Sequence, residues 1–219
     1  MEPLFLTGWN APPDPARLEG VVGHLSEGGL LAIPTETVYG FGCAADPGPV
    51  DHLMTLKGRG PDKPFLVLVP DLDAVAPLAW TEEARELARV FWPGALTLIL
   101  EDPEGLFPPG IRSPRGTVAV RRSPHRLARR VVEALGRPMV STSANLPSAP
   151  PALSAREAWL AARALGAGPR LWVLDGGALA PSEPSTLVDC TGSEPKILRA
   201  GAVPVHRLRC VLPEIHDPV

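Results

Sequence analysis

The chain has few cysteines, and their positions exclude two classes of small protein. Cys43, Cys190 and Cys210 are odd in number, far apart in the sequence and without CxxC spacing. Disulfide frameworks and structural zinc sites require paired or closely spaced cysteines. The histidines show no ligand spacing either, so we expect no protein-bound metal; they are His24, His52, His125, His206 and His216.

Long hydrophobic runs are also absent from the 219 residues. No apolar run approaches the roughly 20 residues needed to cross a bilayer, and no basic segment precedes a hydrophobic one at the N-terminus. We therefore expect a cytoplasmic protein without a membrane partner. Hydrophobic residues make up 45% of the chain, which is enough for a sizeable buried core.

Several common catalytic signatures are missing. The sequence contains no Walker A pattern, no HExxH, no GxSxG and no paired-carboxylate arrangement. The segment from Gly40 to Ala45 matches GxGxxA in letters alone, because Pro47 should interrupt the helix that receives a pyrophosphate. Dinucleotide-binding, metal-hydrolase and serine-hydrolase functions are therefore disfavoured.

The order of apolar and amphipathic segments predicts one α/β domain over residues 1–203, followed by a C-terminal tail at 204–219. No linker, charge block or repeat divides the chain. The irregular alternation of strands and helices predicts a mixed parallel and antiparallel sheet. Helices are expected at 14–28, 50–56, 82–91, 124–135 and 154–165, and strands at 30–33, 65–69, 96–100, 117–121, 138–141, 171–174, 186–189 and 196–199.

Polar residues directly follow the first predicted strand, which covers residues 30–33. The segment Pro34-Thr35-Glu36-Thr37-Val38-Tyr39-Gly40 brings two hydroxyls, a carboxylate and the chain's single tyrosine to the end of that strand. Open α/β sheets commonly bind ligands at strand ends. The alternative is an ordinary turn, since threonine and glycine also favour turns.

Further polar groups lie at or near other strand ends. Lys57-Gly58-Arg59 is expected to place two cations on one side of an extended turn, or else to be a helix C-terminus with cations. Ser141 to Asn145 and Pro184 to Asp189 present hydroxyls and an amide, and Arg199 ends another strand. Capping or turn roles remain open for each segment. Together they predict an anion-binding crevice without a covalent nucleophile.

The segment 112–137 carries eight arginines and one acid, Glu133. Such a cluster is typical either of a solvated helix face or of a surface for nucleotide phosphates or RNA.

Seven motifs in this order resemble the YrdC-like family of threonylcarbamoyl-AMP synthases, in its short single-domain form. They are PTETVYGFG, KGR, WPGALTLIL, TVAVR, STSAN, PSTLVD and ILRAG. The resemblance implies a twisted mixed sheet around a large basic concave cavity. It also implies a nucleotidyltransferase that makes threonylcarbamoyl-AMP and pyrophosphate from L-threonine, bicarbonate and ATP with Mg²⁺. This reaction serves threonylcarbamoyladenosine formation in tRNA, so tRNA and tRNA-modification proteins are implied as further partners.

The resemblance also implies roles for particular residues. Lys57 and Arg59 would be catalytic. ATP would be bound by Lys57, Arg59, Ser143, Asn145 and Arg199. Threonine would be bound by Thr35, Arg121 and Ser185.

Three positions depart from the family pattern. Lys63 stands where many relatives have asparagine, Phe65 to Leu68 contains no histidine, and Leu146 to Pro150 replaces a Ser-Gly turn, which leaves Ser148 without an assigned role. Two alternative functions remain. One is an RNA-binding module, and the other is a carbamoyl-adenylating protein of the hydrogenase-maturation type, although the zinc-finger and acylphosphatase regions of those proteins are absent from this sequence.

Overall fold

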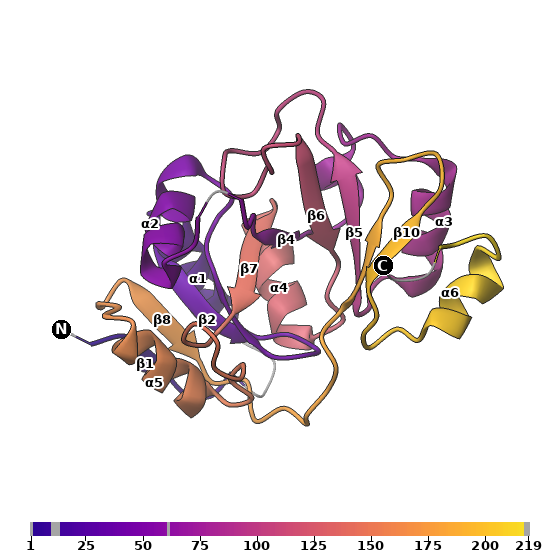
Figure 1. The fold of residues 1–219 in the computed structure, drawn as a ribbon. Helices are drawn as coiled ribbons and strands as arrows, with labels where there is room; N and C mark the ends of the chain where they lie inside the picture. Colours follow the sequence, from indigo (N-terminus) through magenta and orange to yellow (C-terminus); the bar gives the residue numbers. More distant parts are fainter. Residues whose placement is uncertain (1, 10–13, 61, 217–219) are drawn as a thin grey trace.

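The computed structural model describes residues 2–9, 14–60 and 62–216. Within these residues ten strands form one sheet in the order β1-β8-β2-β3-β7-β4-β6-β5-β9-β10 (Figure 1). The strands are β1 (Leu4–Leu6), β2 (Leu30–Pro34), β3 (Tyr39–Gly42), β4 (Leu66–Leu68), β5 (Leu96–Glu101), β6 (Thr117–Arg121), β7 (Met139–Ser143), β8 (Leu171–Leu174), β9 (Thr186–Asp189) and β10 (Lys196–Arg199). The helices are α1 (Pro15–Ser26), α2 (Pro47–Lys57), α3 (Glu82–Phe91), α4 (Arg126–Leu135), α5 (Ala155–Ala164) and α6 (Val205–Val211).

The sheet is mixed, as the sequence predicts. Strand β8 pairs in parallel with β1 and β2, and parallel pairs also join β4 to β6 and β5 to β9. The remaining pairs are antiparallel: β2 with β3, β3 with β7, β4 with β7, β5 with β6, and β9 with β10. The α/β fold class is confirmed.

Strand β2 is buried on both faces, which explains why its residues are uniformly apolar. Leu30 and Ala32 pack into one hydrophobic cluster with α5, whereas Leu31 and Ile33 pack into a second cluster with α1 and α4. Successive side chains of a strand point to opposite faces, so one strand contributes to both layers. In Figure 1 α1 and α4 lie behind the strands and α5 lies in front of them.

The face covered by α1 and α4 is only partly closed. Leu68 and Met139 are paired across β4 and β7 and pack against α4. One pair further along the same face, Leu66 and Ser141 line a cavity instead. The two helices therefore seal one part of this face, and the exposed remainder forms the site described below.

Helix boundaries follow local sequence signals. Thr81 caps α3 through a hydrogen bond from the Ala84 amide to its hydroxyl, and Ser154 with Glu157 forms the expected capping box at α5. Both caps satisfy amides that the first helical turn leaves unpaired. Pro47 does not interrupt a helix but lies in the first turn of α2, where the missing N–H costs nothing.

Besides a single 3-10 turn at Asp73–Val75, three elements were not predicted from the sequence. Strand β1 has only three residues, β3 begins at the end of the segment interpreted as polar, and α6 lies in the predicted tail. Helix α6 packs beside α3 at the right of Figure 1 and buries Leu208. His216 pairs with Lys196 of β10 as an isolated bridge. The domain boundary at residue 203 stays a prediction.

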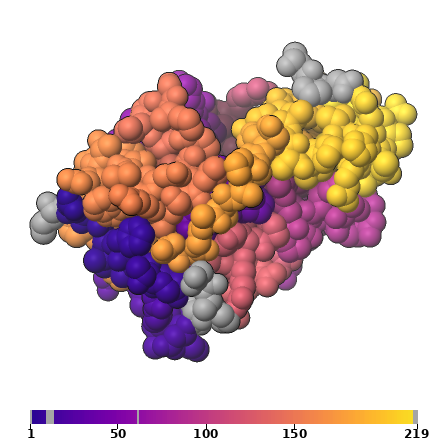
Figure 2. All heavy atoms as spheres, turned by 90° about the horizontal axis from the view of Figure 1, so that it is seen from below, coloured from indigo at the N-terminus to yellow at the C-terminus, as the bar shows by residue number. Residues whose placement is uncertain are grey.

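A long connection without helix or strand joins β8 to β9 over residues 175–185. It is the lower orange segment in Figure 1 and a band across the surface in Figure 2, between the orange part that contains α5 and the yellow C-terminal part. Leu179 donates its amide to the Leu153 carbonyl, and Ser182 donates to the Thr37 carbonyl at 3.2 Å. No helix in the described ranges is long and apolar enough to cross a membrane.

Candidate active site

A cavity of about 510 Å³ lies on the face of the sheet that α1 and α4 leave open. Alternate residues of β6 line it, Ala119 and Arg121, whereas three consecutive residues reach it at the end of β7, Ser141, Thr142 and Ser143. The alternate spacing in β6 is what a β-strand requires of side chains that share one face. Three arginines and no carboxylate are found among the described lining residues; the arginines are Arg59, Arg121 and Arg199.

The segment that follows β2 is the turn of a β-hairpin. The Thr35 hydroxyl donates to the Val38 carbonyl at 2.8 Å. The oxygen of this hydroxyl also accepts the amides of Thr37 and Val38, both at 3.3 Å. The hydroxyl thus closes the turn, which is a common role for threonine. Thr35, Thr37 and Val38 also line the cavity. Both interpretations of this segment therefore hold: it is a turn, and it forms one wall of the site.

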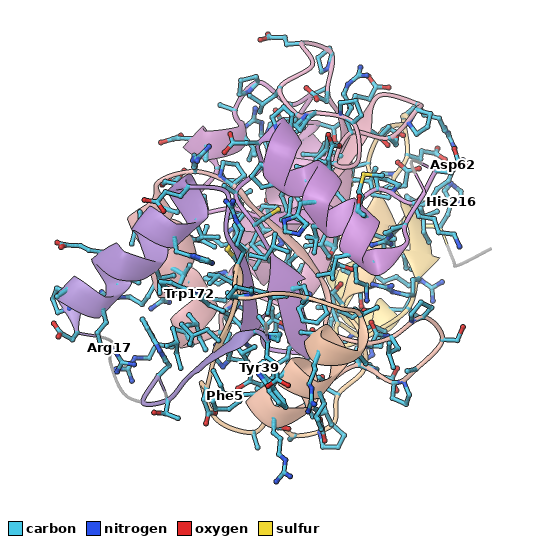
Figure 3. All side chains as sticks on the ribbon, turned by 90° about the vertical axis from the view of Figure 1, so that its left-hand side faces the viewer. Phe5, Arg17, Tyr39, Asp62, Trp172 and His216 are labelled. Carbon is cyan, nitrogen blue, oxygen red and sulfur yellow. The ribbon has the colours of Figure 1, made fainter. Side chains whose placement is uncertain are left out.

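Tyr39, labelled in Figure 3, is buried, and it is not among the residues that line the cavity. Its hydroxyl donates to the Gly177 carbonyl at 2.6 Å and accepts the Gly176 amide at 3.2 Å. Burial raises the pKa of the Tyr39 hydroxyl to about 12. The tyrosine therefore anchors the hairpin to the 175–185 connection.

Lys57, Gly58 and Arg59 form a helix C-terminus, so the expectation of an extended turn is wrong. Gly58 caps α2 with φ of 56°, a left-handed conformation that favours glycine. The Arg59 amide then donates to the Met54 carbonyl, which closes the last turn. This reversal directs both cations toward the segment from Thr142 to Asn145.

The Lys57 ammonium binds that segment. Its Nζ donates to the Ser143 carbonyl at 3.0 Å, to the Asn145 carbonyl at 2.5 Å and to Asn145 Oδ1 at 2.9 Å. Burial, together with the nearby Arg59 charge, lowers the pKa of Lys57 to about 8. Neither Lys57 nor Asn145 is among the residues that line the cavity.

Arg59 does line the cavity. Its Nη1 donates to Thr142 Oγ1 at 3.1 Å, and its guanidinium lies 4.9 Å from the centre of the Phe65 ring. Burial lowers the pKa of Arg59. A guanidinium fixed on one side by a hydroxyl and an aromatic ring retains other N–H groups for an anion.

Arg121 is buried at the end of β6 and forms an ion pair with Glu36 of the hairpin turn. Arg121 Nη1 lies 3.1 Å from Glu36 Oε1. Ser123 donates to the second carboxylate oxygen at 2.5 Å. Burial lowers the pKa of Arg121, whereas the Glu36 charge acts in the opposite direction. The pair connects β6 to the opposite wall of the cavity.

The far wall is built by Ser185 and Arg199. Arg199 Nη2 donates to the Ser185 carbonyl at 2.9 Å and to its hydroxyl at 3.3 Å. The Ser185 hydroxyl also lies 2.9 Å from Thr97 Oγ1 of β5. The two hydroxyls form a buried polar pair beside the arginine.

The structure brings together six of the eight residues that the sequence assigns to the site. Thr35, Arg59, Arg121, Ser143, Ser185 and Arg199 line the cavity. Lys57 and Asn145 are not among the lining residues but contact one of them, Ser143: Lys57 donates to the Ser143 carbonyl, and Asn145 Oδ1 accepts the Ser143 hydroxyl at 2.7 Å. Sequence reasoning missed Thr97, Thr142 and the role of Glu36. Thr97 could have been found, because it is the polar residue of the apolar run LTLIL.

The arginines of segment 112–137 do not form one free basic surface. Four of the eight contact carboxylates: Arg112 with Asp102, Arg121 with Glu36, Arg129 with Glu133, and Arg137 with Asp46. One of the four, Arg121, is buried. Arginines paired with carboxylates offer less net positive charge to RNA, so the interpretation of this segment as an RNA-binding surface is less favoured.

The family model described as "Telomere recombination", for Sua5, YciO and YrdC proteins, matches residues 24–201. The chain belongs to this family. In this family member the KGR, STSAN, PTETVYG and PSTLVD motifs, which are far apart in the sequence, each contribute residues to the lining of one cavity.

Relatives in this family carry a common name. A threonylcarbamoyl-AMP synthase of Pyrococcus abyssi is 37% identical over 202 residues, which cover 91% of this chain and 58% of the relative. A putative threonylcarbamoyl-AMP synthase of Mycobacterium tuberculosis is 38% identical over 194 residues, or 87% of each chain. The crystal structure of P. abyssi Sua5 complexed with L-threonine matches 99% of this chain and 62% of its own, at a TM-score of 0.87 and 32% identity. The chain thus spans about six tenths of the P. abyssi protein.

The described residues contain no group of three or more histidine, cysteine or acidic side chains that could hold a metal ion. Glu36 lies between the lining residues Thr35 and Thr37. Its Oε2 accepts the Ser123 hydroxyl, and its Oε1 lies at ion-pair distance from Arg121 Nη1 but has no hydrogen-bond partner among the described residues.

Proposed function

We propose that the chain catalyses formation of threonylcarbamoyl-AMP and pyrophosphate from L-threonine, bicarbonate and ATP. The observation that carries the proposal is the set of three arginines, from α2's C-terminus, β6 and β10, around one cavity rich in hydroxyls. This arrangement suits a substrate with several anionic groups. The names of the relatives, and the threonine complex of the P. abyssi protein, support the same reaction.

The proposed chemistry requires positioning rather than a protein nucleophile. The threonine amine combines with bicarbonate to give a carbamate and water, and a carbamate oxygen then attacks the α-phosphorus while pyrophosphate leaves. Charge neutralisation and alignment are the main contributions that such a transfer needs. Mg²⁺ would enter as the complex with ATP and share the charge of the triphosphate.

We assign the residues around the cavity to the two substrates, which would meet at the adjacent Ser185 and Arg199. Arg59, Ser143 and Arg199 would bind ATP, with Lys57 and Asn145 hydrogen-bonded to Ser143. Thr35, Arg121 and Ser185 would bind threonine, whose carboxylate suits a guanidinium and whose hydroxyl suits Thr35 or Ser185. Because tRNA modification consumes the product in this scheme, tRNA and tRNA-modification proteins would act after this step.

The test is incubation of the purified protein with ATP, Mg²⁺, bicarbonate and labelled threonine. The expected result is equimolar pyrophosphate and a labelled threonine adduct of AMP, both dependent on bicarbonate. Failure to form either product while the protein still binds tRNA would favour the RNA-binding function instead. Adduct formation from carbamoyl phosphate without threonine would favour the hydrogenase-maturation type of reaction.

A further inference from the structure

We propose that Glu36 is a positioning residue that holds Arg121 in the orientation required to bind the carboxylate of threonine. The inference rests on the proposed function and adds a residue to it. Glu36 lies in the turn between β2 and β3, whereas Arg121 ends β6, and β7 and β4 separate β3 from β6 in the sheet. The ion pair therefore spans the site between two walls that no direct strand pairing connects.

Burial makes this pair unusual among the ion pairs of the described residues. The side chain of Arg121 is 5% exposed and that of Glu36 is 14% exposed, whereas the Asp46 and Arg137 side chains are 43% and 40% exposed. A buried guanidinium is stable only with an opposite charge or several acceptors. Glu36 supplies that charge through an ion-pair contact between its Oε1 and Arg121 Nη1, and Oε1 has no hydrogen-bond partner among the described residues.

Part of the Arg121 guanidinium remains unused. Its Nε is buried and has no hydrogen-bond partner among the described residues, and the side chain lines the cavity. Buried donors are rarely left unpaired in folded proteins. A guanidinium held at one nitrogen, with donors still free, is arranged to accept a second carboxylate, and the amino-acid substrate carries one.

Glu36 is itself fixed. Ser123 donates to Glu36 Oε2 at 2.5 Å, and the Ser123 hydroxyl accepts the amide of His125 at 3.2 Å. Ser123 follows Arg121 by two residues, so both partners of the carboxylate come from the same stretch of chain. The turn with Thr35 on its other side is thereby locked to the end of β6. Movement of Glu36 would therefore displace both Thr35 and Arg121, two of the residues proposed to contact threonine.

In this proposal the charge of Glu36 orients the Arg121 guanidinium and does not itself attract threonine. A carboxylate beside Arg121 weakens its attraction for a substrate anion by simple Coulomb repulsion. If orientation dominates, loss of the charge reduces threonine binding. If net charge dominates, the same loss increases it. The sign of the effect therefore decides between the two.

The experiment compares Glu36→Gln with the wild type in kinetics of pyrophosphate release and in direct binding of threonine. Glutamine keeps the size of the side chain and an oxygen for the Ser123 hydroxyl, but removes the charge that orients Arg121. We expect KM for threonine to rise about tenfold, the equivalent of one charge-assisted hydrogen bond, while KM for ATP changes less than about twofold. L-threoninamide lacks the carboxylate, so its KM should change little between the wild type and Glu36→Gln. The preference of the enzyme for threonine over threoninamide should therefore fall in the variant.

Two variants serve as controls. Asp46→Asn breaks an arginine–carboxylate pair of similar chemistry outside the lining of the cavity, and it should leave both KM values unchanged. Ser123→Ala removes only the hydroxyl that fixes Glu36 and should raise KM for threonine by a few fold. It provides the test if Glu36→Gln fails to fold.

Each outcome has one meaning. A wild type that forms no threonine adduct contradicts the proposed function itself. An active wild type whose Glu36→Gln variant binds threonine equally or more tightly overturns the positioning role. The same holds if the preference for threonine over threoninamide persists, or if Asp46→Asn produces the same shift.

Discussion

The ammonium of Lys57 donates hydrogen bonds to both oxygens of Asn145, the carbonyl at 2.5 Å and Oδ1 at 2.9 Å. A third bond goes to the Ser143 carbonyl at 3.0 Å. An ammonium has three hydrogens, so this set uses all of them. Only the protonated amine can make the three bonds at once, and the position of Ser143 at the cavity therefore depends on the charge of Lys57.

This dependence predicts weaker ATP binding in alkaline solution. The pKa of Lys57 is lowered to about 8, so above that pH the amine loses a proton and one of its three bonds. In Lys57→Arg the guanidinium keeps its charge throughout. We expect wild-type affinity for ATP to fall as the pH rises past about 8, and the variant to bind more weakly at pH 7 but without that fall. Titration of ATP binding between pH 6.5 and 9.5 measures both.

The free energy of unfolding should also depend on the protonation of Lys57, but it should rise with pH where the affinity for ATP falls. Between about pH 8 and the ordinary lysine pKa of 10.5, the unfolded chain binds a proton that the native state lacks. Stability contributed by Lys57 therefore increases with pH across this window. Lys63→Arg, at an exposed position, is the matched control and should alter neither profile. An alkaline fall in ATP affinity that is identical in the wild type and Lys57→Arg would exclude Lys57 as its cause.

Replacement of Arg59 should be severe. Its guanidinium lines the cavity and is oriented by Thr142 and Phe65. Loss of one preorganised donor to developing charge typically costs about 10²- to 10³-fold in rate. We expect Arg59→Ala to reduce pyrophosphate release from ATP, threonine and bicarbonate by at least about 10²-fold. Arg137→Ala, outside the cavity lining, is the control, and near-normal turnover of Arg59→Ala would remove this residue from the site.

Alanine substitutions at two glycines of β3, Gly40 and Gly42, should have different effects, one on catalysis and the other on stability. A Cβ at Gly40 would lie 2.8 Å from the Ser141 hydroxyl, a side chain that can move, and 3.1 Å from the Thr142 carbonyl, which would have to shift by only a few tenths of an ångström. A Cβ at Gly42 would lie 2.4 Å from the Val140 carbonyl of the neighbouring backbone. Because Gly40 lines the cavity, Gly40→Ala should impair catalysis more than stability, by obstructing the site and displacing Ser141.

Gly42→Ala should instead destabilise the fold, by about 1–3 kcal/mol, because the backbone of β7 must shift. Urea denaturation gives the free energy of unfolding for each variant, and steady-state kinetics gives the activity. Equal stability losses with equal activities would contradict the distinction between the two glycines.

The sequence was sufficient for the α/β class, for the mixed sheet and for six of the residues that line the cavity. Strands such as Leu30 to Ile33 are uniformly apolar because helices cover both faces, and helix starts such as Thr81 carry local capping signals. Polar residues at strand ends then indicated the site. Strand β3 was missed because its Tyr-Gly-Phe-Gly sequence is short and half glycine, and it exists through pairing with β2 and β7.

Contacts between distant segments could not be predicted at all. Lys57 to Asn145 and Glu36 to Arg121 each join residues more than eighty positions apart. A local sequence pattern does not identify the distant partner of a side chain, because that partner depends on which strands become neighbours in the sheet. This is why the hydrogen bonds from the Lys57 ammonium to Ser143 and Asn145 could not be predicted from the sequence, and the expected contact of Lys57 with ATP stays a prediction.

Tyr39 offers a test that separates structure from catalysis. Tyr39→Phe removes the hydroxyl that the Gly177 carbonyl and the Gly176 amide share. Unpaired buried groups of this kind cost about 1–3 kcal/mol. We expect the free energy of unfolding to fall by that amount, with KM values for ATP and threonine within about twofold of the wild type, because Tyr39 does not line the cavity. A large change in either KM with unchanged stability would place Tyr39 in the site.

The pH dependence of the same variant supplies an independent check. The pKa of Tyr39 is raised to about 12 by burial, from an ordinary value of 10.0. Unfolding releases the proton more readily in this window, so the stability contributed by Tyr39 is complete below about pH 10 and declines toward pH 12. The difference in stability between the wild type and Tyr39→Phe should shrink over that range. As the chain has a single tyrosine, the ultraviolet absorbance of tyrosinate reports this ionisation directly, and a midpoint near 10 in the native protein would contradict the burial of the hydroxyl.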